Sequence, residues 1–232
     1  MAALKPQERI IVALDVSSAE EARALVDRLS GRVGMFKIGS QLFTAAGPGF
    51  VRELAGRGEK VFLDLKFHDI PNTVAGAVSA ACQLGVSLLD VHALGGRAML
   101  EAAVGALPAM GARLLAVTIL TSMDEGGHGE VGLNGHVADS VRRLAQLARE
   151  TRLDGVVASP HEVALVRAAC GPDFLIVTPG IRPAGAARGD QARAATPRAA
   201  LDAGADLLVI GRPISGAPDP VRAAEELAAE IA

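Results

Sequence analysis

Short apolar runs recur along the chain at intervals of roughly 20–35 residues, as expected for strands that alternate with helices. Nearly every position in these runs is hydrophobic, which is typical of parallel strands covered by helices. The segments between them are rich in Ala, Leu, Glu and Arg at helical spacing. The first such segment begins at Ser17 or Ser18 with Glu20 and Glu21 behind it, which predicts a capped helix start. The predicted strands are residues 10–16, 34–39, 60–67, 88–94, 113–120, 154–159, 174–181 and 207–213.

Eight strands in 232 residues predict a (β/α)8 TIM barrel, with residues 1–232 as a single domain. A doubly wound open sheet is the alternative, but it would carry a glycine-rich phosphate loop after its first strand, and "ALDVSSAEEA" has no glycine. The least regular segments are 121–135 and 182–197. Each follows the carboxyl end of a predicted strand, where barrels carry their functional loops.

Composition excludes several classes of function. The net charge is −3 with both signs mixed, and the chain has six Phe and no Trp or Tyr, which argues against a nucleic-acid surface. No apolar run approaches the roughly 18 residues of a membrane span, and the start "MAALKPQERI" lacks the apolar stretch of a secretion signal. Cys82 and Cys170 have no partner motif. We therefore expect a cytoplasmic protein with no nucleic-acid or membrane partner.

Ionisable residues interrupt the third apolar run, "FLDLKFHDIPNTV" at 62–74. Because strand side chains alternate, Asp64 and Lys66 should share one face. Asp15 and Lys37 lie near the ends of the first two strands, so these four groups should meet at the carboxyl rim of the barrel. Asp15 could instead cap the helix that follows it. Asp69 lies past the strand with the opposite parity, and we expect it to point elsewhere, towards another subunit.

Two glycine–arginine motifs follow the seventh and eighth strands, "PGIRP" at 179–183 and "VIGRPIS" at 209–215. This corner commonly binds phosphate in such barrels. Backbone N–H groups at Gly211 and Arg212, with the Arg212 guanidinium, suit a phosphate dianion. The segment that contains Gln191 could then close over it.

The histidines are not expected to be catalytic. Asp90 and His92 in the fourth strand approach the same rim, but His68 and His92 have no obvious proton to move and are predicted to be structural. His128 and His136, in a glycine-rich segment, are too isolated to predict a metal site.

Several of these segments resemble the orotidine 5′-phosphate decarboxylase family, in its short, single-function bacterial form. The resemblance runs from about residue 9 to 225. The D-x-K-x-x-D core alone is shared with related phosphosugar decarboxylases and synthases, whereas "IPNTV" together with "PGIRP…GDQ" is more specific. The matching segments are ALD (13–15), FKIG (36–39), FLDLKFHDIPNTV (62–74), LTS (120–122), ASP (158–160), PGIRP (179–183), GDQAR (189–193) and VIGRPI (209–214).

The resemblance implies a (β/α)8 homodimer that needs no cofactor or metal. Such enzymes are carboxy-lyases that convert orotidine 5′-monophosphate to uridine 5′-monophosphate (UMP) and CO2, the last step of de novo pyrimidine synthesis. The implied catalytic residues are Lys66, which would stabilise and protonate the C6 carbanion, Asp64, which would face the leaving carboxylate, and Lys37 and Asp69, which would complete the array. The implied substrate-binding residues are Asp15, Lys37, Thr73, Thr121, Ser159, Arg182, Gln191, Gly211 and Arg212. Asp69 and Thr73 would come from the partner subunit.

The chemistry explains why such a site needs charge inside a strand. A carbanion formed at C6 has no adjacent electron sink, so preorganised positive charge must stabilise it. Burial would deprotonate a lysine, and flanking carboxylates oppose that. Two other hypotheses remain, a phosphosugar lyase that uses Mg²⁺ and a phosphate-binding barrel without activity, and Asp64, Lys66 and Asp69 would then be an ion-pair network. The segment "DEGGHGEVG" at 124–132 departs from the family pattern and leaves its own shape open.

Overall fold

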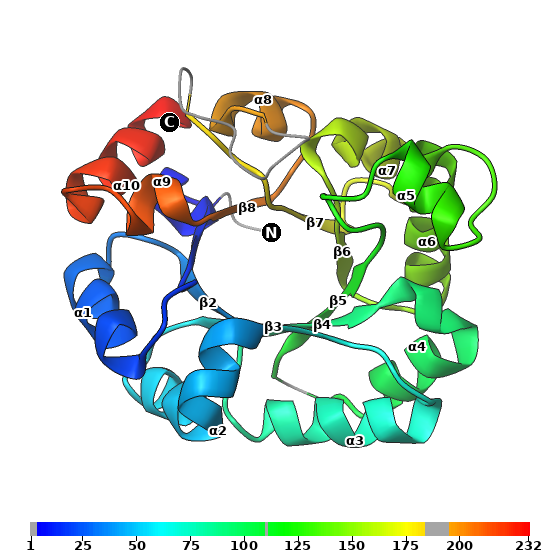
Figure 1. Ribbon diagram of the computed structural model, residues 1–232, viewed down its shortest axis with the longest axis horizontal. Coiled ribbons are helices and arrows are strands. Elements are labelled where there is room, and N and C mark those ends of the chain that lie inside the picture. Colours follow the sequence, from blue (N-terminus) through cyan, green and yellow to red (C-terminus); the bar gives the residue numbers. More distant parts are fainter. Residues whose placement is uncertain (1–3, 110, 184–194) are drawn as a thin grey trace.

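Eight parallel strands form a closed barrel in the computed structural model, which describes residues 4–109, 111–183 and 195–232 (Figure 1). Each strand pairs with the next in sequence, and the last pairs with the first. This confirms the predicted TIM barrel and excludes the open sheet. The strands are β1 (Ile10–Ala13), β2 (Met35–Gly39), β3 (Val61–Phe67), β4 (Leu88–His92), β5 (Arg113–Val117), β6 (Gly155–Val157), β7 (Leu175–Thr178) and β8 (Leu207–Ile210).

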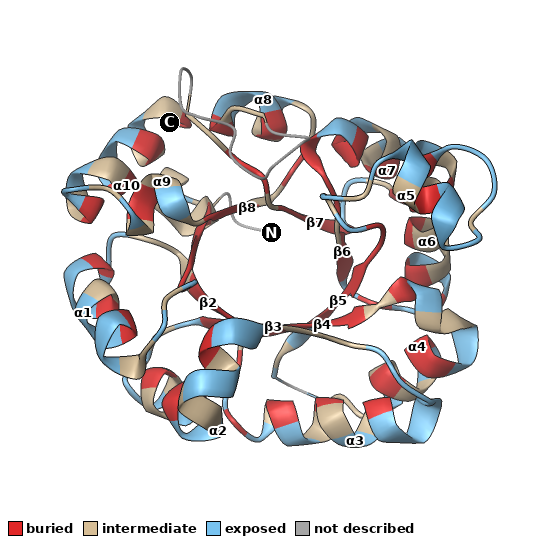
Figure 2. Cartoon of the chain, in the orientation of Figure 1, coloured by how far each residue is buried: buried red, intermediate tan, exposed pale blue. Residues whose placement is uncertain are grey.

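Helices surround the barrel and turn their buried faces towards it (Figure 2). The α-helices are α1 (Ala19–Leu29), α2 (Ser40–Gly56), α3 (Pro71–Cys82), α4 (Gly96–Gly105), α5 (Glu125–Glu130), α6 (Val137–Glu150), α7 (Val163–Cys170), α8 (Pro197–Asp202), α9 (Arg212–Ser215) and α10 (Pro220–Glu230). Short 3-10 turns are η1 (Pro6–Arg9), η2 (Ala93–Gly95) and η3 (Pro160–Glu162). None of the helices in the described ranges is both long and apolar enough to cross a membrane.

The start of α1 settles the two roles considered for Asp15. Ser18 is the N-cap, and its hydroxyl accepts a hydrogen bond from the Glu21 N–H at 3.2 Å. Glu21 in turn accepts from the Ser17 N–H at 3.2 Å, so the predicted capped start is present, with the second bond one residue before the N-cap N–H of a regular capping box. Asp15 is therefore not the helix cap, and its carboxylate is available to the barrel rim.

The core has two parts, because strand side chains alternate between the helices and the barrel interior. The larger part fills the space between strands and helices. The smaller part fills the lower interior of the barrel, where Ile11, Phe62, Leu115, Val177 and Val209 are buried together. These residues form an apolar floor, so the interior positions nearer the carboxyl ends of the strands are the ones that remain for polar groups.

The segment 121–135 is more regular than predicted, because residues 125–130 form helix α5. Asp124 caps it by accepting a hydrogen bond from the Gly127 N–H at 2.9 Å. His128 is buried, and its Nε2 lies 2.9 Å from the Ser140 hydroxyl on α6. Contacts to α6 therefore impose a helix on a glycine-rich stretch whose intrinsic helix propensity is low.

Candidate active site

Strand β3 carries a bulge where the charged residues lie. The four steps from Leu63 to Phe67 on β3 match only the two from Leu89 to Val91 on β4. Lys66 adopts a left-handed backbone conformation, with φ of 51°, which is costly for any residue except glycine. Strain of this kind is concentrated at functional sites. Asp64 and Lys66, which were predicted to share one face, are in contact, although the bulge interrupts the regular pairing of this part of β3.

Four side chains of alternating sign form a continuous array across β1, β2 and β3. Lys37 Nζ lies 3.1 Å from Asp15 Oδ1 and 3.2 Å from Asp64 Oδ2. Asp64 also contacts the Lys66 ammonium through Oδ1. The Lys37 and Asp64 side chains are only 10% and 11% exposed, whereas that of Lys66 is 38% exposed. Both lysines line the same cavity, and Lys66 is the more accessible of the two to a bound molecule.

The pKa shifts within the array favour the charged forms of Lys37 and Asp64. Burial by itself would lower the pKa of Lys37, but the carboxylates of Asp64 and Asp15 outweigh it and raise that pKa. Burial would likewise raise the pKa of Asp64. The Lys37 charge, a hydrogen bond with Asp90 and the Lys66 charge together lower it to about 2.

The array lies on one side of a cavity of about 380 Å³ at the carboxyl rim of the barrel. The cavity reaches from the lysines to the ends of β7 and β8, where Arg182 and Arg212 line it together with Gly180 and Gly211. Burial and the neighbouring Arg212 charge lower the pKa of Arg182, so two guanidinium groups share this corner. Gly180 has a φ of 77°, a conformation suited to glycine, and it allows the chain to turn there. The corner therefore fits a doubly charged anion.

Most, but not all, of the predicted site residues line this cavity. Those that do are Asp15, Lys37, Asp64, Lys66, Thr121, Arg182, Gly211 and Arg212. Ser159 is buried, and its hydroxyl accepts from the His161 N–H at 3.4 Å without lining the cavity. Asp69 and Thr73 are exposed on the molecular surface and do not line it. Gln191 lies outside the described residues.

Asp90 is the site residue that sequence reasoning did not select. Its side chain is completely buried beneath the array, and its Oδ1 accepts a hydrogen bond from the Lys66 backbone N–H at 2.8 Å. Alternation along β4 places Asp90 at an interior position, which was the available signal. The contact itself depends on the β3 bulge, which only strand pairing reveals.

His68 and His92 stack on each other with ring centroids 5.2 Å apart. His92 Nδ1 accepts from the Leu94 N–H at 3.3 Å, and burial, His68 and Lys66 lower the pKa of His92 to about 4. His92 is therefore neutral at physiological pH. These contacts fit the structural role predicted for both rings. Across residues 4–109, 111–183 and 195–232, no group of three or more His, Cys, Asp or Glu side chains is arranged to hold a metal ion.

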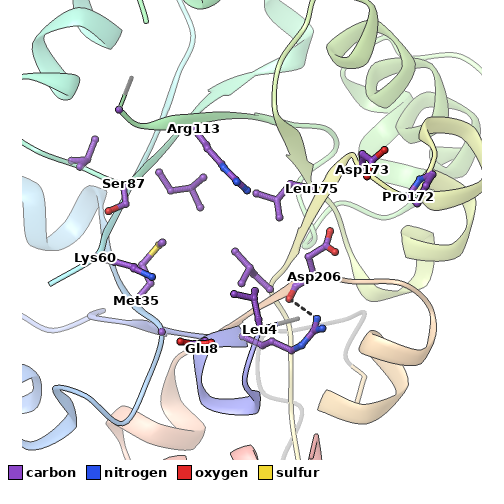
Figure 3. A pocket seen from close by; sticks show the side chains of 16 residues that line it. Leu4, Glu8, Met35, Lys60, Ser87, Arg113, Pro172, Asp173, Leu175 and Asp206 are labelled. Atoms are coloured by element: carbon purple, nitrogen blue, oxygen red, sulfur yellow. Dashed lines mark hydrogen bonds between the residues drawn. The ribbon is translucent and has the colours of Figure 1, made fainter. Parts of the chain in front are cut away.

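A larger cavity, of about 700 Å³, opens at the opposite end of the barrel (Figure 3). Its lining includes the first residues of several strands, among them Met35, Leu88 and Arg113. Asp206, which also lines it, accepts from the Ile176 N–H and from Arg167, each at 2.7 Å, so its carboxylate ties strands and helices together. In barrels of this fold the catalytic groups lie at the opposite face, at the carboxyl ends of the strands. The smaller cavity is therefore the candidate active site.

Fold and site together define a (β/α)8 barrel with a buried array of lysines and carboxylates beside an arginine-lined corner. Residues 8–227 match the model of the orotidine 5′-phosphate decarboxylase / HUMPS family, and the chain belongs to that family. A protein of Moorella thermoacetica named orotidine 5′-phosphate decarboxylase is 56% identical over 239 residues, which cover 100% of this chain and 95% of the relative. One of Geobacter sulfurreducens with the same name is 55% identical, over 97% of this chain and 96% of the relative. The crystal structure of orotidine 5′-phosphate decarboxylase from Lactobacillus acidophilus superposes with a TM-score of 0.84 at 39% identity, over 96% of this chain and 98% of that one.

Proposed function

We infer that this chain is an orotidine 5′-phosphate decarboxylase, which converts orotidine 5′-monophosphate to UMP and CO2 in pyrimidine biosynthesis. The observation that carries the inference is the placement of the Lys66 ammonium, held by Asp64, in a cavity that ends in an arginine-lined corner. The relatives named for this activity match the chain over nearly its whole length.

We propose that the substrate lies across the cavity with its phosphate at Arg182, Arg212 and the Gly211 N–H. Two guanidinium groups and a backbone donor match a phosphate dianion. Gln191 would complete the phosphate contacts. Asp15 and Lys37 would then hold the ribose hydroxyls, and Thr121 and Ser159 would contact ribose or base. The pyrimidine would lie over Lys66 and Asp64.

In this pose the bond from C6 to the carboxyl carbon breaks, CO2 leaves, and the electron pair stays on C6. The Lys66 ammonium stabilises that carbanion and then donates its proton to C6, which gives UMP. Asp64, which would face the leaving carboxylate, holds the Lys66 ammonium in place. Because the phosphate corner is remote from C6, its binding energy is available to hold the reacting ring in place.

We further propose a homodimer in which the partner subunit supplies Asp69 and Thr73. Both residues are exposed in the single chain, and neither lines its own cavity. Nearby, Ile70 is 66% exposed and Leu94 is 40% exposed, and the His68–His92 stack holds the two turns that carry them side by side. An exposed apolar pair beside unused polar site residues supports an interface at this face. Cys82 and Cys170 are both free thiols, which supports a cytoplasmic location.

The activity test follows the absorbance of orotidine 5′-monophosphate after addition of the protein. Lys66→Ala should lower turnover by roughly 10³-fold or more, because it removes both the proton donor and the charge at C6. Lys60→Ala is the matched control, since Lys60 is exposed and lines the cavity at the opposite end of the barrel. Turnover that persists in Lys66→Ala, or that is absent from the unmodified protein, would contradict the proposal.

The shared site can be tested by mixing two inactive variants, Lys66→Ala and Asp69→Ala. Each heterodimer would contain one site with both native residues and one with neither. Random exchange of subunits at equal amounts should therefore restore about a quarter of the native activity. No recovery, under conditions in which subunit exchange is demonstrated by mass, would show that Asp69 acts in its own subunit or not at all.

A further inference from the structure

Asp90 lies at the one point of β4 that faces the bulge of β3. Its neighbours on β4, Leu89 and Val91, pair with Leu63 and Phe67, so Asp90 alone faces the extra length of β3. In a regular parallel ladder the Lys66 N–H would find a backbone carbonyl on β4. Here it donates to Asp90 Oδ1 at 2.8 Å instead. One carboxyl oxygen of Asp90 therefore replaces a missing bond of the sheet.

The other carboxyl oxygen has a different environment. Asp90 Oδ2 is completely buried, and within the described part of the chain no donor reaches it. The carboxyl group lies within hydrogen-bonding contact of Asp64, and Leu115 stands opposite on β5. Two adjacent carboxylates in a buried site cannot both stay ionised. Asp64 has two ammonium partners, Lys37 and Lys66, so the negative charge belongs on Asp64 and the proton on Asp90.

We propose that Asp90 is a positioning residue that remains a neutral carboxylic acid, donates its proton to Asp64 and accepts from the Lys66 backbone N–H. It thereby fixes both the left-handed backbone of Lys66 and the direction of the Asp64 carboxylate. The inference rests on the proposed decarboxylase for its effect on catalysis, but not for the proton itself. Burial and the Asp64 charge raise the pKa of Asp90 well above its usual value, in agreement with this geometry.

Asp90→Asn is the first variant, since an asparagine can reproduce both bonds, with its oxygen towards Lys66 N–H and its amide towards Asp64. We expect kcat and KM within about threefold of the native enzyme. Asp90→Leu has a similar size but neither bond. We expect it to lower kcat by at least about tenfold with KM nearly unchanged, because Lys66 loses its backbone anchor while the phosphate corner stays intact.

Stability against pH gives a readout that does not depend on activity. In the unfolded chain Asp90 ionises near pH 4, so folding at neutral pH must take up a proton. The native protein therefore loses stability as the pH rises from about 4 towards the raised pKa of the folded state. Asparagine has no such cost. The folding equilibrium constant of Asp90→Asn should therefore gain on the native protein by up to tenfold per pH unit across that range. Asp64 and Lys66 on β3 are the charged groups that act on Asp90, and their own contributions are shared by both proteins and largely cancel in the difference.

Asp154→Asn is the matched control, because Asp154 also accepts from a strand N–H, that of Leu114 at 2.8 Å, but is exposed. It should show no comparable gain with pH. The proposal that Asp90 is a neutral carboxylic acid would be overturned by a difference in folding stability between native protein and Asp90→Asn that does not change with pH. A loss of kcat above about 100-fold in Asp90→Asn would overturn it too. Equal kcat in Asp90→Asn and Asp90→Leu would overturn the positioning role. If Asp90→Leu does not fold, the kcat of Asp90→Asn and the pH series still test the role of Asp90. If the native protein does not decarboxylate orotidine 5′-monophosphate, the proposed function fails, while the pH series still tests whether Asp90 carries a proton.

Discussion

Asp64 links two lysines, and Asp64→Asn tests how much that charge stabilises the protein. A fall in pKa from 3.8 to about 2 corresponds to roughly 2–3 kcal/mol in favour of the charged folded form. Because the pKa is lowered on folding, this stability is fully present above pH 4 and is lost as pH falls through about 2. Removing the charge also leaves Lys37, whose side chain is 10% exposed, with Asp15 as its remaining partner in the array.

Asp64→Asn should therefore lower the free energy of unfolding at pH 7 by about 2–3 kcal/mol, and the deficit should shrink below pH 4. Urea titration followed by far-ultraviolet circular dichroism measures it, since the chain has no Trp or Tyr to report by fluorescence. Asp27→Asn is the control, because it breaks an exposed pair with Arg57 and should change the unfolding midpoint little. Equal stability of native protein and Asp64→Asn at pH 7, or a deficit that persists unchanged to pH 2, would refute the reasoning.

Three further predictions concern separate parts of the molecule. Arg212→Ala should raise KM for orotidine 5′-monophosphate more than tenfold and weaken inhibition by inorganic phosphate. Unchanged values for both would show that Arg212 does not bind the phosphate. Ile70→Glu should shift the protein towards monomer in analytical ultracentrifugation and lower activity at low protein concentration, because it places a charge in the proposed interface. An unaltered sedimentation profile would show that Ile70 lies outside the interface. Ser18→Ala should cost about 1 kcal/mol in urea unfolding by removing the cap of α1, with Ser17→Ala as the control that retains the capping hydroxyl.

The barrel was predictable because each strand is a compact apolar run and no glycine-rich loop follows the first. The rim position of Asp15, Lys37, Asp64 and Lys66 followed from strand ends alone. The Asp90 contact did not, since it depends on a mismatch in length between β3 and β4 that only pairing defines. Helix α5 was missed for a similar reason, because His128 and Ser140 hold it through a contact 12 residues apart, against the local preference of glycine.

The alternating array at the end of β3 has a consequence for how the enzyme responds to ionic strength. Asp15, Lys37, Asp64 and Lys66 cancel in charge, and the central pair is almost entirely shielded from solvent. Dissolved ions screen that central pair little, whereas the half-buried Arg182 and exposed Arg212 are open to competing anions. If the substrate phosphate binds at Arg182 and Arg212 as proposed, added salt should weaken substrate binding at β7 and β8 more than it disturbs the Lys37–Asp64 pair. Rising salt should therefore raise KM at concentrations that change kcat much less.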